Sequence, residues 1–229
     1  MTQVTEAQVS AGQMAYGRLT LFLYDRLVLG ASCSWLWGCK AKVMLSQYRE
    51  LVSDNHLDVG VGSGYFLDNC QFPSDSPRIA LMDLNDNSLE FTAKRISRYS
   101  PEVYRRNVLE DMSVSAGKFD SVAMNLLLHC LPGPLDYKGR IFDLCKGIMN
   151  DDAVLFGATI VGAGTSQSWF AKKMIHFYNR KGIFTNKDDS EESLRMELNK
   201  RFSNVSVRTN GCIAIFSAQN RINKDTYHY

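Results

Sequence analysis

The sequence lacks a long hydrophobic run, a surplus of charge of one sign and any internal repeat. Its most apolar N-terminal stretch, Leu19 to Leu29, is interrupted by Asp25 and Arg26, which argues against a membrane-spanning helix or a signal peptide there. The 26 basic and 24 acidic residues leave a net charge of +2, too small to indicate a dedicated nucleic-acid-binding protein. We therefore expect neither a membrane nor a nucleic-acid partner.

Cysteine spacing of the kind that holds metals is also missing. The six cysteines form no C-x-x-C pair and no zinc-like pattern with the four histidines, so we expect no metal site. An even number of cysteines would permit disulfides, but 229 residues with 45% hydrophobic content can build a core without them. Free thiols in a reducing compartment, the cytoplasm, are the favoured interpretation. The cysteines are Cys33, Cys39, Cys70, Cys130, Cys145 and Cys212.

The hydrophobic periodicity divides the chain into three parts. Residues 1–54 contain two predicted helices, at 11–29 and 32–52, which we interpret as an N-terminal helical cap. Short apolar strands and helices then alternate, which predicts a parallel sheet with helices on both faces, a doubly wound α/β fold. The predicted strands are 56–59, 78–82, 103–106, 119–124 and 153–161, and the predicted helices between them are 65–70, 87–99 and 136–149.

The last part of the chain breaks this alternation. Two helices are predicted at 166–181 and 190–202, followed by strand-like runs at 205–209 and 212–218 joined by Asn210-Gly211. Asn-Gly between two strands is a strong hairpin signal, so the sheet is expected to end in an antiparallel pair. We therefore expect one domain: a core over 55–220 with the helix 166–181 inserted, and a polar tail over 221–229.

The most informative segment lies between the first strand and its helix. It contains Asp58, Gly60, Gly62 and Gly64, so that three alternate glycines follow a strand directly. Glycines let a backbone turn tightly and approach a ligand, and the helix N-terminus that follows offers unpaired amides. The third glycine comes one residue earlier than in the dinucleotide-binding pattern G-x-G-x-x-G, which disfavours a dehydrogenase. The segment resembles the D/E-x-G-x-G-x-G motif of class I S-adenosylmethionine-dependent methyltransferases.

This resemblance implies a Rossmann-like methyltransferase fold, a mostly parallel seven-stranded sheet with a reversed last strand, and S-adenosylmethionine as cofactor. Asp83, at the end of the second strand, is then expected to bind the ribose hydroxyls; its alternative role is a helix N-cap. Asn107 stands where the family more often has Asp near the adenine, and a plain turn residue is its alternative. Tyr16 and Tyr24, from the N-terminal helices, either reach over the cofactor's carboxylate as a lid or pack in the core. The cofactor residues implied are Asp58, Gly60, Gly62, Gly64, Asp83, Leu84, Asn107, Val108, Asn125 and Tyr24.

A general base would help a neutral hydroxyl to accept the methyl group. His129 follows the fourth strand at the ligand-facing end of the sheet and is the leading candidate. The alternative is a structural histidine that holds the turn at Leu131-Pro132-Gly133. His176, in the inserted helix, is a second candidate.

The substrate is expected between the N-terminal helices and the helix at 166–181. These segments are rich in aromatic residues, which pack in the core or line a pocket for a flat or apolar ligand. Methyltransferases that modify amino groups of DNA bases or of protein glutamine resemble one another in an N-P-P-Y-like sequence, and none follows the fourth strand here. A small metabolite and O-methylation are therefore favoured. A non-methylating reaction such as cyclisation, a non-catalytic partner subunit and a homodimer remain open. The aromatic residues concerned are Trp35, Trp37, Trp169, Phe170 and Tyr178.

Overall fold

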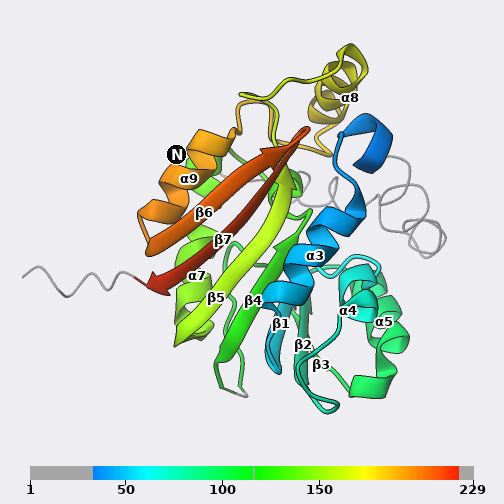
Figure 1. Cartoon of the computed structure of the whole chain (residues 1–229), viewed down its shortest axis with the longest axis vertical. Coiled ribbons are helices and arrows are strands. Elements are labelled where there is room, and N and C mark those ends of the chain that lie inside the picture. Colours follow the sequence, from blue (N-terminus) through cyan, green and yellow to red (C-terminus); the bar gives the residue numbers. More distant parts are fainter. Residues whose placement is uncertain (1–32, 116, 222–229) are drawn as a thin grey trace, which may run out of the picture.

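A seven-stranded sheet forms the centre of the computed structural model, which describes residues 33–115 and 117–221 (Figure 1). The strand order is β3-β2-β1-β4-β5-β7-β6. The predicted strands are all confirmed, although β5 begins four residues before its predicted start (149 against 153). The strands are β1 (Asn55–Val59), β2 (Arg78–Asp83), β3 (Glu102–Arg105), β4 (Phe119–Asn125), β5 (Met149–Ile160), β6 (Phe202–Asn210) and β7 (Ile213–Arg221).

The pairing confirms the doubly wound topology with a reversed last strand. β1 pairs in parallel with β2 and β4, β2 with β3, and β4 with β5. β7 is antiparallel to both of its neighbours, β5 and β6, so the final hairpin inserts its second strand between β5 and β6. The strand order reverses between β1 and β4, which is the place where open α/β sheets bind ligands.

Several predicted helices are shorter than expected or are divided. The helix predicted at 87–99 ends at Arg95 and is followed by a 3₁₀ turn, and the one at 136–149 is split at Gly139. The described helices are α3 (Ala41–Leu51), α4 (Tyr65–Asn69), α5 (Asp86–Arg95), α6 (Leu135–Lys138), α7 (Arg140–Ile148), α8 (Trp169–Arg180) and α9 (Glu191–Asn199), with 3₁₀ turns η2 (Ser97–Tyr99) and η3 (Leu128–Cys130).

The continuous helix predicted over 32–52 is wrong in its first half. Residues 33–36 form one π-helical turn, the chain then leaves the helix, and α3 begins only at Ala41. Gly38 has φ +70°, and the backbone of Gly211 in the final hairpin turn packs closely against it. The N–H of Cys212 donates to the carbonyl oxygen of Trp37 (2.7 Å). This long-range contact, which helix periodicity does not record, ends the helical run.

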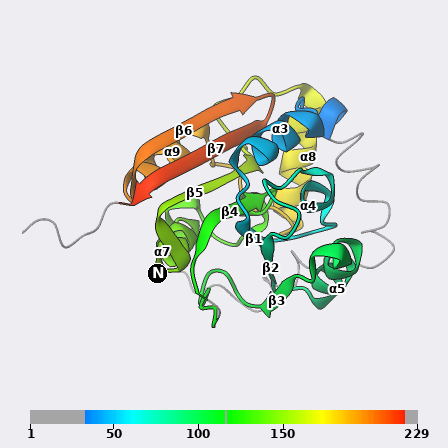
Figure 2. The same ribbon diagram turned by 60° about the horizontal axis from the view of Figure 1, so that its bottom comes forward.

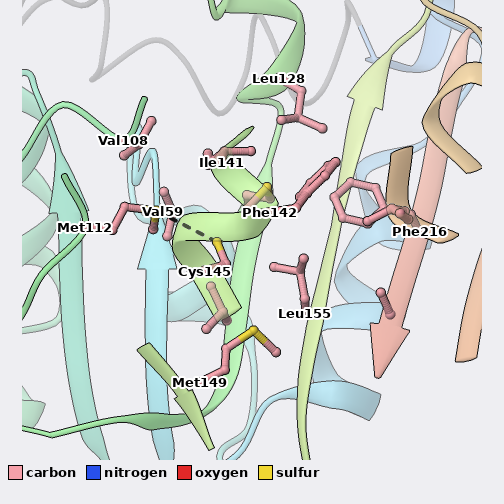
Figure 3. Packing of buried hydrophobic residues seen from close by; sticks show 14 of the residues in the cluster. Val59, Val108, Met112, Leu128, Ile141, Phe142, Cys145, Met149, Leu155 and Phe216 are labelled. Carbon is pink, nitrogen blue, oxygen red and sulfur yellow. Dashed lines mark hydrogen bonds between the residues drawn. The ribbon is translucent and has the colours of Figure 1, made fainter. Parts of the chain in front are cut away.

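Hydrophobic residues pack on both faces of the sheet, as a doubly wound fold requires. On one face α3, α4, α5 and α8 cover the sheet, and on the other α6, α7 and α9 do so. Figure 2 shows α3 and α7 on opposite sides. Figure 3 shows the second face, where Phe142 of α7 lies among Ile141, Leu128, Leu155 and Phe216. We call these the α3 face and the α7 face.

Two further findings concern the described residues as a group. Within 33–115 and 117–221, no helix is long and apolar enough to cross a bilayer. All six cysteines are free thiols, and four of them are buried.

Candidate active site

The glycine loop between β1 and α4 has a left-handed backbone conformation at each of its three glycines. Gly60, Gly62 and Gly64 have φ values of +73°, +52° and +71°, a region that costs other L-residues about 1–2 kcal/mol each. A Cβ atom would lie 2.8 Å from Leu127 at Gly60 and 2.7 Å from Thr92 at Gly64. At Gly62 it would meet no described atom within 4 Å. The outer glycines are thus fixed by packing, and the middle one faces open space that a ligand can fill.

Asp83 lies at the end of β2 beside this loop. Burial raises the pKa of its carboxyl to about 6, while the backbone amides of Asn85, Leu84, Gly62 and Val61 lower it. One carboxyl oxygen accepts from the N–H of Asn85 (2.9 Å). The alternative role, the N-cap of the next helix, belongs to Asn85, whose side chain accepts from the first amides of α5. Asp83 is therefore a partly buried carboxylate next to the glycine loop, the place predicted for a ribose contact.

The end of β4 carries a buried amide side chain, that of Asn125. Both polar atoms of the Asn125 side chain are buried, and neither makes a hydrogen bond within the described residues. The next residue, Leu126, has φ +57°, which is strained for a residue with a β-carbon. Buried amides are normally hydrogen-bonded, and strained backbone concentrates at functional sites. Both features fit the predicted contact with the methionine portion of the cofactor.

Asn107, in the segment after β3, makes hydrogen bonds within its own turn. The side-chain oxygen of Asn107 accepts from the N–H of Leu109 (3.2 Å), and its carbonyl accepts from Glu110. These bonds show the turn role, which leaves an additional adenine contact as a prediction. Val108 is buried in the core of the α7 face, and Leu84 is partly exposed next to Asp83.

Asp58 takes part in a buried hydrogen-bond chain that the sequence reasoning did not identify. The hydroxyl of Tyr48 in α3 donates to Asp58 Oδ2 (2.5 Å) and lies 2.7 Å from His56 Nε2. His56 Nδ1 lies 2.7 Å from Ser121 Oγ in β4. Burial raises the pKa of Asp58 to about 7, which the Tyr48 bond partly offsets and the charge of Asp83 increases. The sequence signal was available: polar residues alternate at 56 and 58 within a buried strand.

His129 lies in a closed environment. Its Nδ1 is 3.3 Å from Thr159 Oγ1 and accepts from the N–H of Ile160 (3.4 Å), and the ring packs edge-on against Phe184. Burial, followed by the charge of Lys138, lowers its pKa to about 3. When Nδ1 accepts, the ring proton resides on Nε2, so Nε2 is a donor in this arrangement. These contacts fit a structural histidine as well as a general base, so the catalytic role of His129 stays a prediction.

The aromatic residues predicted near the substrate divide into two groups. Trp37 is buried, and it packs with Tyr178 and His129 around Phe184, at ring distances of 6.1, 4.7 and 4.5 Å. Phe184 was not among the predicted residues, although it is the centre of this cluster. Trp35, Trp169, Phe170 and His176 are exposed. Tyr16 and Tyr24 lie outside the described residues.

The glycine loop, the acidic residue after the second strand and the reversed last strand together define a class I methyltransferase fold. Comparison with known proteins agrees. The family described as "Methyltransferase domain" matches residues 57–156. Demethylluteothin O-methyltransferase of Streptomyces thioluteus is 36% identical over 213 residues, 93% of each chain. The physcion biosynthesis cluster O-methyltransferase of Aspergillus chevalieri is 36% identical over 209 residues, 90% of this chain and 94% of the relative.

The chain therefore belongs to the S-adenosylmethionine-dependent methyltransferases of this family. A solved structure of DhpI in complex with S-adenosylhomocysteine aligns with 94% of this chain and 98% of its own, with a TM-score of 0.65. At 13% identity that alignment supports the fold. The predicted family, fold and cofactor are confirmed.

Proposed function

We propose that this enzyme transfers the methyl group of S-adenosylmethionine to an oxygen atom of a small aromatic or apolar metabolite. The observation that carries the proposal is the set of features gathered at the carboxyl ends of β1, β2 and β4. Open space at Gly62 lies beside the Asp83 carboxylate, and the Asn125 amide lacks a partner within the described residues. The two O-methyltransferase relatives support oxygen as the acceptor atom.

Each cofactor residue has a proposed task. The amides of the glycine loop and the Asp83 carboxylate hold the amino-acid and ribose portions. Leu84 and Val108 border the adenine with Asn107 at its amino group, Asn125 holds the methionine portion, and Tyr24 closes the site. When bound, S-adenosylmethionine supplies a methyl group that its sulfonium has already activated. The residues therefore act mainly by orienting the acceptor, which can contribute about 7–11 kcal/mol.

The acceptor class can be tested with matched compounds. Purified protein is incubated with S-adenosylmethionine and with phenols, anilines and thiophenols that share one ring system, and products are followed by mass spectrometry. We expect methylated phenols and S-adenosylhomocysteine in equal amounts. Methylation of anilines alone would move the acceptor to nitrogen. A converted acceptor of unchanged methyl content, formed without S-adenosylhomocysteine, would indicate a non-methylating reaction.

The general-base role of His129 needs its own test, since its ring is also a packing group. If His129 is the base, His129→Gln lowers kcat about 10²–10⁴-fold and leaves the affinity for S-adenosylhomocysteine unchanged. If it is only structural, the variant loses stability in a urea titration while kcat per folded molecule is retained. His176→Gln, at the exposed second candidate, is measured in parallel, and a loss of kcat in that variant instead would assign the base to His176.

Compartment and assembly remain further proposals. Six free thiols support a reducing compartment such as the cytoplasm, and the edge strands β3 and β6 are the proposed surfaces for a homodimer. Fractionation of cells and light scattering of the purified protein test these two points. The division into a cap over 1–54 and a core over 55–220 also stays a prediction.

A further inference from the structure

The hydrogen-bond chain that ends at Asp58 crosses the interior of the α3 face. It connects the loop before β1, where Ser53 lies, with the end of β1 at the glycine loop. The N–H of Ser53 donates to Ser121 Oγ (2.9 Å). His56, Tyr48 and Asp58 then follow at 2.7, 2.7 and 2.5 Å. Five residues from α3, β1, β4 and a connecting loop are joined in one row.

The donors in this row all point the same way. The single proton of the Tyr48 hydroxyl is used on Asp58, so His56 Nε2 must donate to the Tyr48 oxygen. His56 Nδ1 then lacks a proton and accepts from Ser121 Oγ. Burial lowers the pKa of His56 to about 3, which keeps the ring neutral and this order intact. Every donor is therefore directed toward the Asp58 carboxylate.

Aromatic rings enclose the row and hold the Tyr48 ring in place. Phe66 stacks on Tyr48 with ring centres 5.7 Å apart, and Phe156 packs edge-on against it at 5.3 Å. Phe72 packs against His56. An apolar pair at positions 48 and 56 would satisfy packing at least as well, because buried polar groups contribute little net stability compared with well-packed apolar ones. The polar row thus indicates a task at its end, Asp58.

Asp58 accepts the Tyr48 proton through one of its two carboxyl oxygens, Oδ2. A buried carboxylate next to the glycine loop is complementary to a cation, and the amino-acid end of the cofactor carries an ammonium group. We propose that Tyr48, oriented by His56, is a positioning residue that holds Asp58 as an anion for the ammonium group of S-adenosylmethionine. This proposal rests on the cofactor site proposed above.

Two ligands separate this role from a general structural one. S-adenosylhomocysteine carries the amino-acid portion, whereas 5′-methylthioadenosine lacks it but keeps the adenine and ribose. Both are titrated by calorimetry into the full chain, wild type and Tyr48→Phe, between pH 6 and 8.5. Tyr104→Phe is the matched control, because it removes a tyrosine hydroxyl that donates to a carboxylate, Glu102 (2.6 Å), at the far edge of the sheet.

We expect Tyr48→Phe to weaken S-adenosylhomocysteine about tenfold at pH 7 and methylthioadenosine less than about twofold. The hydroxyl lowers the pKa of Asp58, so its removal moves the pH below which S-adenosylhomocysteine affinity falls to a higher value. Asp83, Cys70 and His56 are the other titratable groups near Asp58 and Tyr48. Asp83 affects both ligands through the ribose, so the difference between the ligands isolates Asp58.

Equal losses for both ligands, or no loss for either, would overturn the positioning role. Failure of the wild type to bind S-adenosylhomocysteine would instead reject the proposed site as a whole. If Tyr48→Phe does not fold, His56→Leu provides the second variant, because it keeps the hydroxyl and removes its orientation. The same upward movement of the pH midpoint, smaller in size, is expected there, and an unchanged midpoint contradicts the proposal.

Discussion

The two faces of the sheet are built on different principles. On the α7 face, Phe142 lies in a cluster of buried apolar residues (Figure 3). On the α3 face, the same strand β1 places His56 and Asp58 under Tyr48, inside walls of aromatic rings. Tyr48 and Phe142 are both fully buried. The α7 face therefore serves mainly stability. On the α3 face, a less stabilising polar row positions the carboxylate of Asp58.

Phe142→Ala is expected to have the largest effect and to act on stability alone. Phe142 is fully buried and contacts the ring of Phe216, so its truncation leaves a cavity that costs about 3–5 kcal/mol. Urea unfolding measures this loss, and calorimetry of the folded fraction should give an unchanged affinity for S-adenosylhomocysteine. Phe170→Ala, at an exposed site, is the control with little loss. A large change of affinity in Phe142→Ala would mean that the two faces are not separable.

Asp58→Asn is expected to show the opposite pattern. It keeps the volume of the side chain but removes the charge, so affinity for S-adenosylhomocysteine should fall by about 1.5–3 kcal/mol, the contribution of a hydrogen bond to a charged group. Stability in urea should change less than in Phe142→Ala. Should the variant bind as tightly as the wild type, Asp58 would have no direct role in holding the cofactor.

Two glycines on the α3 side sharpen the comparison within one loop. Gly62→Ala and Gly64→Ala both place alanine at positive φ, at a cost of about 1–2 kcal/mol each. Gly64→Ala also forces a Cβ atom against Thr92, so it should unfold at lower urea concentration than Gly62→Ala. Gly62→Ala should lose more cofactor affinity, since its new methyl group enters the open space. If Gly64→Ala lost more cofactor affinity and Gly62→Ala lost more stability, the cofactor would not occupy the space beside Gly62.

The smallest expected effect concerns pH. Asp58 has a raised pKa of about 7 in the folded protein, so it contributes stability at low pH that is lost as the pH rises through 7. Asp58→Asn removes this loss, and its melting temperature relative to the wild type should rise by a few degrees between pH 5 and 8. The buried histidines, whose pKa values are lowered to about 3, act in the opposite direction in both proteins. A difference that stays constant with pH contradicts the assignment.

The sequence predicted those features that depend on local patterns. The glycine spacing, the Asn210-Gly211 hairpin and the alternation of strands and helices identified the fold and the loop beside Asp83. Features that depend on distant contacts were missed. The helix break before α3 requires Gly211 to pack on Gly38, and the role of Tyr48 requires a helix residue to meet two strand residues.

His129 combines a position that local patterns predicted with a contact that they did not predict. Its place after the fourth strand was predicted correctly, but no pattern in the sequence indicates that Phe184 covers its ring. Phe184 belongs to the loop after α8, and that loop reaches His129 because the N–H of Thr185 donates to the His129 carbonyl (2.9 Å). Periodicity finds which face of an element is buried, whereas the identity of the covering residue follows only from the assembled fold.

The contact between Gly38 and Gly211 sets an order of events during synthesis. A ribosome releases residue 38 long before residue 211, so the segment at 33–40 cannot make its hairpin contacts until the end of the chain has been synthesised. The Trp37–Cys212 hydrogen bond then joins the first described segment to one of the last. A nascent chain truncated before this hairpin would possess its glycine loop but lack the hairpin contacts of Trp37 and Gly38, which lead into α3.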